Sequence, residues 1–276
     1  MSITAELHNS AKSTINPYRI GASVIFNRLK YDLSPYSLRN FYKLKNLRDK
    51  YLGQKCVILC NGPSLNNVDF DALDESGIFT IGLNKINLLF NRVNHRPKLI
   101  VSVNQHVIEQ NFDFFSKTDI PIFLDYITTK TSGVDMSVLK SRQNLHFLNS
   151  VHVLGEFAKD VSLGVCQGYT VTYVATQLAY HLGFTKVALV GCDHNFETKG
   201  MVNKEIKLNG HDPNHFDPNY FSQKDKWQLP DLLGSEFHYQ LARDEYVNSG
   251  RTIYNCTDGG KLELFERLNL LDFLKL

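Results

Sequence analysis

The chain of 276 residues is long enough for one large globular domain or two small ones. Its hydrophobic content of 43% and charged content of 21% are those of a folded protein, which excludes a largely disordered chain. No apolar run reaches the roughly 20 residues of a membrane span, and the start of the chain lacks the apolar segment of a secretory signal. We therefore expect a cytoplasmic protein.

The positive charge is concentrated at the start of the chain. Residues 1–50 hold nine Lys and Arg against three Asp and Glu, whereas the whole chain has a net charge of only +2. Such a segment is either a solvated helical extension or a surface that binds an anionic membrane, and the solvated extension is the simpler interpretation. We expect no nucleic-acid partner. The charge pattern divides the chain into a basic helical extension, 1–50, and a main domain, 51–276.

In chain order, the first clear periodicity is helical. From Ser37 to Tyr51, apolar residues recur every three to four positions. The pattern then alternates between short Val-, Ile- and Leu-rich runs and longer helical stretches. The expected strands are Cys56–Cys60, Phe79–Leu83, Leu99–Val103, Ile122–Leu124, Leu145–Leu148, Val187–Val190 and Thr252–Asn255. The expected helices between and after them are Gln105–Phe115, Thr170–Gly183, Leu232–Ser249 and Lys261–Leu274.

This alternation predicts the fold class. Strands that are apolar on both faces and separated by helices are typical of a parallel sheet with right-handed crossovers. We expect an α/β, Rossmann-like domain with a mostly parallel sheet flanked by helices. Residues 197–230 fit neither period and are rich in His, Tyr and Trp, so we interpret them as a lid-like insertion.

The five cysteines are scattered and form no CxxC pair. Cys56 and Cys60 share one side of the first strand by the period of two. We expect buried free thiols, as in a reducing compartment, and no zinc site.

Polar residues follow several of the expected strands. Ligands of an open parallel sheet bind at the carboxyl ends of its strands. The residues at these positions are Asn61, Gly62, Ser64, Asn84, Asn104, Asp193 and Asn195. Each Asn or Asp alone is an ordinary turn former, but their succession favours a binding site.

The first of these loops, Asn61-Gly62-Pro63-Ser64, matches neither the GxGxxG dinucleotide fingerprint nor the GxxxxGK[ST] phosphate loop. Its backbone amides could still bind an oxyanion. Thr170 or Thr172 could cap the helix expected over Thr170–Gly183, and the free amides of its first turn could then face a phosphate. Asp193 is a single acid, a weak signal for a metal, and we expect none.

The quoted stretches "CNGPSL", "GLNK", "VSVNQ", "TVTYVATQLAYHLGFTKVALVGCDHNF", "NHFDPNYF" and "GRTIYNCTDGGKLELF" resemble, in this order, the MptE-like superfamily. That superfamily is similar to bacterial lipooligosaccharide sialyltransferases and motility-associated flagellin glycosyltransferases. It also contains archaeal hydroxymethylpterin diphosphokinases. The resemblance covers residues 55 to about 270 and implies a metal-independent transferase that uses a CMP-linked nonulosonic sugar.

The resemblance also implies residue roles. His215 matches the family's catalytic base, although its context is Asn-His-Phe instead of Ser-His-Tyr. The expected nucleotide and donor-sugar residues are Asn61, Gly62, Ser64, Asn84, Asn104, Thr170, Thr172 and Asp193. Tyrosines that hold the leaving phosphate in the sialyltransferases are replaced here by His194, Asn195 and Phe196. The clamp would then come from Tyr169, Tyr220 or Lys199.

Three functions stay open at this point. The first is transfer of a sialic acid-like sugar to a surface glycan or glycolipid at the inner membrane, which the resemblance favours. The second is pyrophosphoryl transfer to a pterin, which would need Mg²⁺ and more acids near Asp193 than Glu197 supplies. The third is a non-catalytic nucleotide-binding module. The sequence leaves the acceptor and the oligomeric state open, a homo-oligomer included.

Overall fold

The computed structural model describes residues 16–150, 155–196, 201–202, 204–207, 212–221 and 225–276. Eight strands form one parallel sheet: β1 (Lys55–Leu59), β2 (Phe79–Leu83), β3 (Leu99–Ser102), β4 (Ile122–Asp125), β5 (Leu145–Leu148), β6 (Lys186–Val190), β9 (Thr252–Asn255) and β10 (Glu266–Arg267). Each neighbouring pair in this sheet is parallel. The expected α/β, Rossmann-like fold is confirmed.

The strands form because apolar residues fill both of their faces. In β1, the side chains of Cys56 and Ile58 enter one core and those of Val57 and Leu59 enter the other, as a period of two requires. All four are completely buried. The five cysteines are free and buried, as predicted. A strand buried on both faces needs helices on both, and the remaining chain supplies them.

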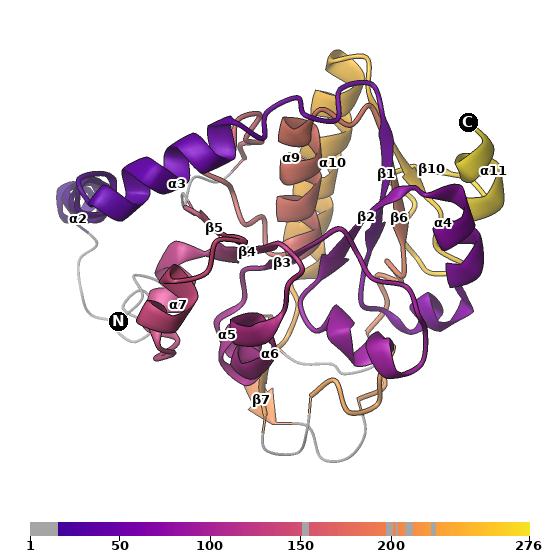
Figure 1. Cartoon of the computed structure of the whole chain (residues 1–276), viewed down its shortest axis with the longest axis horizontal. Helices are drawn as coiled ribbons and strands as arrows, with labels where there is room; N and C mark the ends of the chain where they lie inside the picture. Colours follow the sequence, from indigo (N-terminus) through magenta and orange to yellow (C-terminus); the bar gives the residue numbers. More distant parts are fainter. Residues whose placement is uncertain (1–15, 151–154, 197–200, 203, 208–211, 222–224) are drawn as a thin grey trace.

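Helices cover both faces of the sheet (Figure 1). One face carries α9 (Val171–Leu182) and α10 (Leu232–Asn248), which pack against each other. The other carries α4 (Phe70–Ser76) and α11 (Leu270–Lys275), which are also in contact. The remaining helical segments are α2 (Pro17–Asp32), α3 (Pro35–Lys45), η1 (Pro63–Asn67), η2 (Ile86–Asn91), α5 (Gln105–Gln110), α6 (Phe112–Lys117), α7 (Tyr126–Thr131) and α8 (Met136–Lys140).

The order of the strands locates a crevice. The order is β10-β9-β6-β1-β2-β3-β4-β5, so the chain runs outward from β1 to β5 and then returns to β6 on the other side of β1. The direction of winding thus reverses between β1 and β6. In open α/β sheets, this switch point is where ligands bind, at the carboxyl ends of the strands.

Three helix predictions need correction. The helix expected from Ser37 to Tyr51 ends at Lys45, because the following turns bond to the end of α9 through the amides of Asp49 and Tyr51. The stretch Gln105–Phe115 divides into α5 and α6 at Asn111, whose amide still donates to the Val107 carbonyl.

The helix expected over Lys261–Leu274 is wrong for residues 261–269. Glu266 and Arg267 instead form the edge strand β10 beside β9. The Arg267 side chain holds this segment in place by donating to the Gly259 carbonyl. Only the last turn is helical, starting after Asn269, whose side chain accepts from the Leu271 amide.

The described parts of the segment 197–230 are ordered by packing. β7 (Glu205–Lys207) pairs antiparallel with β8 (Lys226–Gln228). Between them, Phe216, Tyr220 and Phe221 join the apolar core on the α4 side of the sheet. Lys199 lies outside the described residues.

The start of the described chain is attached to the sheet at its far edge. The Asn40 side chain on α3 donates to the Phe147 carbonyl (2.6 Å) and accepts from the Phe147 amide (2.9 Å). α3 therefore completes the hydrogen bonding of the edge strand β5. The proposed division of the chain at residue 50 remains a prediction.

Candidate functional site

The turn after β1 and the turn after β6 are in direct contact at the switch point. The Ser64 amide and hydroxyl both donate to Asp193 Oδ2, at 3.2 and 2.8 Å. A Cβ on Gly62 would lie 2.0 Å from the same oxygen, so a glycine is required by close approach and not by its φ of −73°. Asp193 therefore occupies the start of η1, and the Ser64 donors expected to face a phosphate serve this carboxylate.

Asn61 leaves an acceptor without a partner. The residue is buried, and its side-chain oxygen Oδ1 has no hydrogen-bond partner among the described residues. A buried polar atom without a partner costs about 1–3 kcal/mol, so such atoms point to a ligand or an ordered water. A ribose hydroxyl or a base amino group would supply the missing donor.

The start of α9 lies next to the turn after β1. Thr170 caps α9, its hydroxyl accepting from the Thr172 amide at 3.3 Å. The Thr172 hydroxyl lies 3.7 Å from Cys60 Sγ, at the end of β1, and that of Thr170 lies 3.4 Å from the Tyr239 hydroxyl on α10. The Cys192 thiol and burial raise the pKa of Cys60 well above its usual value. Cys60 is thus a neutral packing residue and not a nucleophile.

The loop that bears His215 lies across the ends of β1 and η1. The Phe216 amide donates to the Asn61 carbonyl (2.9 Å), and the Asn66 side chain donates to the Phe216 carbonyl (2.9 Å). These two bonds hold the residue next to His215 against Asn61 and Asn66, although Asn61 is more than 150 positions away in sequence.

The His215 imidazole is held in a fixed orientation. Its Nδ1 lies 2.7 Å from Oδ2 of Asp212, whose side chain is completely buried. The ring stacks on Tyr220, with centroids 4.1 Å apart and planes 7° apart. Phe221 and Trp227 pack around it at 5.3 and 6.0 Å. An acceptor carboxylate on Nδ1 directs the lone pair of a neutral imidazole to Nε2.

The end of β2 supports the same loop. Asn84 adopts a left-handed φ of 50°, accepts from the Ser102 hydroxyl (3.1 Å) and bonds to the Tyr220 hydroxyl. Lys85 is buried, donates to the Tyr220 carbonyl (2.6 Å) and lies 3.7 Å from Asp225. Burial lowers the pKa of Lys85 and raises that of Tyr220. Tyr220 is thus a neutral hydroxyl that is already hydrogen-bonded.

The structure brings most of the predicted residues together. Asn61, Gly62, Ser64 and Asp193 form one contact group. The His215 loop is bonded to Asn61 of this group, and Thr172 contacts the neighbouring Cys60. Three others have different surroundings. Asn104 uses its side-chain oxygen to cap α5, Asn195 is exposed, and Tyr169 is 47% exposed with its ring toward α10. Their expected ligand contacts remain predictions.

Sequence reasoning missed Asp212 and Lys85. Asp212 is three residues before His215, a spacing that also occurs by chance in many polar loops. The signal for Lys85 was its place directly after Asn84 at a strand end. A lysine is seldom this buried, so its role becomes visible only in the fold. The Nε2 atom of His194 lies 2.9 Å from the carboxylate of Glu236 on α10.

A solved structure with a similar fold is that of the MAf glycosyltransferase from Magnetospirillum magneticum AMB-1. The two share 16% sequence identity with a TM-score of 0.50. The match covers 84% of this chain but 38% of that one, so this chain corresponds to well under half of its length. At this identity, the likeness shows a shared fold alone.

No curated protein matches the chain. A family model described as 6-hydroxymethylpterin diphosphokinase MptE-like matches residues 35–199, more than half of the chain. The matched region runs from α3 past β6 and includes the contact between Ser64 and Asp193, but not the His215 loop. The resemblance noted in the sequence is confirmed, and the chain belongs to the MptE-like family.

Proposed function

We propose that this chain is a glycosyltransferase that moves a nonulosonic, sialic acid-like sugar from a CMP-activated donor to a surface glycan. The observation that carries the proposal is the Asp212–His215 pair, which is bonded through Phe216 to the end of β1 at the switch point. A positioned imidazole next to a nucleotide crevice is what a transfer to a hydroxyl acceptor needs. The glycosyltransferase named above, similar in fold, supports the same class.

The reaction would use His215 as general base. Nε2 takes the proton of the acceptor hydroxyl while the acceptor oxygen bonds to the anomeric carbon of the donor sugar. The bond from that carbon to the phosphate oxygen breaks, and CMP leaves with the electron pair. Asp212 accepts from Nδ1–H throughout and stabilises the imidazolium that forms.

The nucleotide would lie between the ends of β1 and β6. The free Asn61 Oδ1 would accept from the ribose or the cytosine amino group. Asp193 already accepts from Ser64, so its second carboxylate oxygen, Oδ1, would accept from the ribose. The half-exposed Tyr169 is the better placed candidate for the leaving phosphate, because the Tyr220 hydroxyl is used within the fold.

The family description favours a second candidate, pyrophosphoryl transfer from ATP to a pterin. Both reactions need a phosphate at the switch point, so the binding residues alone do not separate them. They differ in nucleotide and in the need for Mg²⁺.

The two candidates are separated by following the melting temperature of the full chain during titration with CMP and with ATP plus Mg²⁺. We expect a saturable increase with CMP, abolished in Asn61→Ala. A shift with ATP and none with CMP would reject the sugar-transfer proposal.

His215→Asn should keep the CMP shift and lose transfer. The matched control His106→Asn, which removes a histidine that pairs with Glu205, should keep both.

We propose further that the acceptor is held at an anionic membrane, which the chain would meet with α2. Among the described residues, no helix is long and apolar enough to cross a bilayer. The apolar side chains of Ile25, Phe26 and Leu29 on α2, and of Leu33 directly after it, are nevertheless exposed on one side of the helix, Phe26 at 66%. Phe26→Glu should lower binding to vesicles that contain phosphatidylglycerol. Unchanged binding would reject α2 as the membrane-binding surface.

A further inference from the structure

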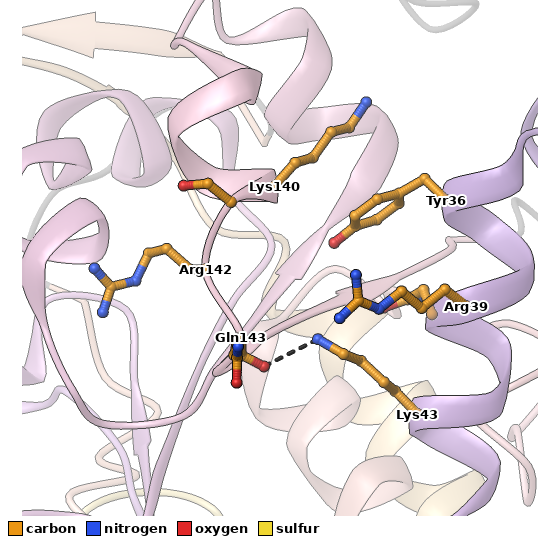
Figure 2. A pocket seen from close by; sticks show the side chains of 8 residues that line it. Tyr36, Arg39, Lys43, Lys140, Arg142 and Gln143 are labelled. Atoms are coloured by element: carbon orange, nitrogen blue, oxygen red, sulfur yellow. Dashed lines mark hydrogen bonds between the residues drawn. The ribbon is translucent and has the colours of Figure 1, made fainter.

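A small hollow lined by positively charged side chains lies next to the edge strand β5 (Figure 2). It measures about 30 Å³ and lies between α3 and the turn that joins α8 to β5. Its lining is Tyr36, Arg39, Asn40, Lys43, Lys140, Ser141, Arg142 and Gln143. Gln143 precedes β5, so the hollow is at the amino end of that strand, whereas the proposed active site is at the carboxyl ends.

The lining holds four cationic side chains and no carboxylate. Among the ion pairs between described residues, none includes Arg39, Lys43, Lys140 or Arg142. Most other arginines and several lysines of the described chain do have an acidic neighbour. Four uncompensated cations around one hollow create a positive potential that attracts an anion.

Two of the four are committed to the fold and two are not. Arg142 donates to the carbonyls of Ser116 and Thr118, and Figure 2 shows it directed away from the hollow. Lys43 donates to the Gln143 carbonyl (2.9 Å) with its ammonium at the centre of the group. Arg39 has no hydrogen-bond partner among the described residues. Lys140 lies over the Tyr36 ring at 5.3 Å, and Figure 2 shows its ammonium directed away from Arg39 and Lys43.

The crowding of positive charge has visible effects nearby. Burial lowers the pKa of Lys43, and the neighbouring Arg39 lowers it further. Burial, with Lys43 next, lowers the pKa of His146 on β5 to about 4. A bound anion would reverse the effect of these like charges on one another.

The size of the hollow limits the ligand. A cavity of about 10–15 Å³ holds one water by this measure, so this hollow takes one small group and not a nucleotide base. A planar guanidinium and two ammonium groups are the donors that proteins use for phosphate. We propose that Arg39 and Lys43, joined by Lys140 when its side chain turns in from the Tyr36 ring, form a binding site for a single phosphate group, separate from the proposed active site.

Such a phosphate could belong to a soluble molecule or to a lipid headgroup. The apolar side chains of α3 that are more than half exposed, Leu38 and Tyr42, lie about 100° around the helix axis from Arg39 and Lys43. A flat membrane surface that met these apolar side chains would therefore not face the hollow directly, which favours a soluble phosphate compound.

The test uses two double variants of equal charge. R39Q/K140Q removes the two cations that make no hydrogen bond within the described chain, so folding should be preserved. K45Q/K50Q removes two exposed cations from the same end of the chain, outside the lining. Binding of inorganic phosphate is measured by calorimetry at constant ionic strength. We expect saturable binding by the wild type and K45Q/K50Q, and about tenfold weaker binding by R39Q/K140Q.

The proposal would be overturned if R39Q/K140Q bound phosphate as well as K45Q/K50Q does, or if the wild type bound neither inorganic phosphate nor vesicles with phosphatidic acid. Vesicles of phosphatidylcholine with and without phosphatidic acid identify the source. A loss of vesicle binding in R39Q/K140Q, but not in K45Q/K50Q, would support the site with a lipid phosphate as its ligand. Phosphate binding that depends on the hollow, with vesicle binding equal in all variants, would support it with a soluble ligand.

Discussion

The two ends of the sheet differ in whether their charged side chains have partners within the fold. At the carboxyl ends of β1 and β6, Asp193 is hydrogen-bonded to Ser64 and His215 to Asp212, so these charged or ionisable side chains have internal partners. At the amino end of β5, Arg39 and Lys140 have no acidic partner among the described residues. Internal pairing fixes orientation, which chemistry requires, whereas unpaired charge provides affinity for an ion from outside.

The largest expected effect is a loss of catalysis at the carboxyl ends of the strands. In Asp212→Asn, the new side-chain amide would donate to Nδ1 of His215, so the ring proton would move to Nε2 and the base would be lost. We expect single-turnover sugar transfer to fall by about 10²–10⁴-fold. The melting temperature checks that the fold is kept.

The matched control is Asp74→Asn. Asp74 lies 2.7 Å from Nδ1 of His95 in the same type of pair, but His95 Nε2 bonds to Thr80 near the amino end of β2. This variant should transfer sugar at the wild-type rate. Wild-type turnover in Asp212→Asn would remove His215 from the role of base.

The second effect concerns packing at the carboxyl end of β1, with an open position on α2 for comparison. Gly62→Ala would place a Cβ 2.0 Å from Asp193 Oδ2 and 2.7 Å from the Gly191 carbonyl, and we expect a loss of about 2–3 kcal/mol in the free energy of unfolding. Gly21→Ala on α2 meets no atom within 4 Å and should instead gain about 0.5–1 kcal/mol from helix propensity. Urea denaturation measures both, and equal effects would contradict the tight contact described at the switch point.

Much of the fold could be predicted because its signals are local. The seven expected strands were found to within one residue at each end, since Val, Ile and Leu runs bounded by turns mark a strand that is buried on both faces. The helix over Lys261–Leu274 failed because pairing with β9, a tertiary contact, overrides helix propensity at Glu266 and Arg267. The β10, β7 and β8 strands are too short to show a period.

The candidate site was predictable only in part, for a similar reason. Strand ends identified Asn61, Gly62, Ser64 and Asp193, and the topology then showed that these flank the switch point. The partner of His215 and the burial of Lys85 depend on how a long loop folds back, which no local pattern encodes. The hollow at Arg39 was visible in the sequence only as a general excess of positive charge, because its other half, Lys140, comes from a segment 100 positions away.

The third effect is the coupling between Ser64 and Asp193. Hydrogen bonds to a charged group contribute about 1.5–3 kcal/mol, less where solvent reaches the pair, so we expect a coupling of about 1–2 kcal/mol. Ser64→Ala, Asp193→Asn and the double variant give this value from urea denaturation. Additive effects would mean that the two side chains do not pair in solution.

The smallest effect tests the amino end. The pKa of His146 is lowered from 6.5 to about 4 by burial and by Lys43. Between these two pH values, the unfolded chain holds a proton on His146 that the folded chain does not. The stability contributed by the neutral ring is therefore present above pH 6.5 and is lost as the pH falls toward 4. A shift of this size corresponds to at most about 3 kcal/mol, and we expect about 1 kcal/mol because the ring is partly exposed.

Unfolding free energy measured from pH 7 to pH 4 should thus fall less steeply in His146→Gln than in the wild type. Lys43→Gln should change the slope in the same direction but more weakly, because it removes the positive charge that lowers the pKa of His146 without removing the buried ring. An identical slope in all three proteins would mean that the cations around the hollow do not act on β5. The uncompensated charge that distinguishes this end from the carboxyl end would then be screened by solvent, and the basis for anion binding there would be lost.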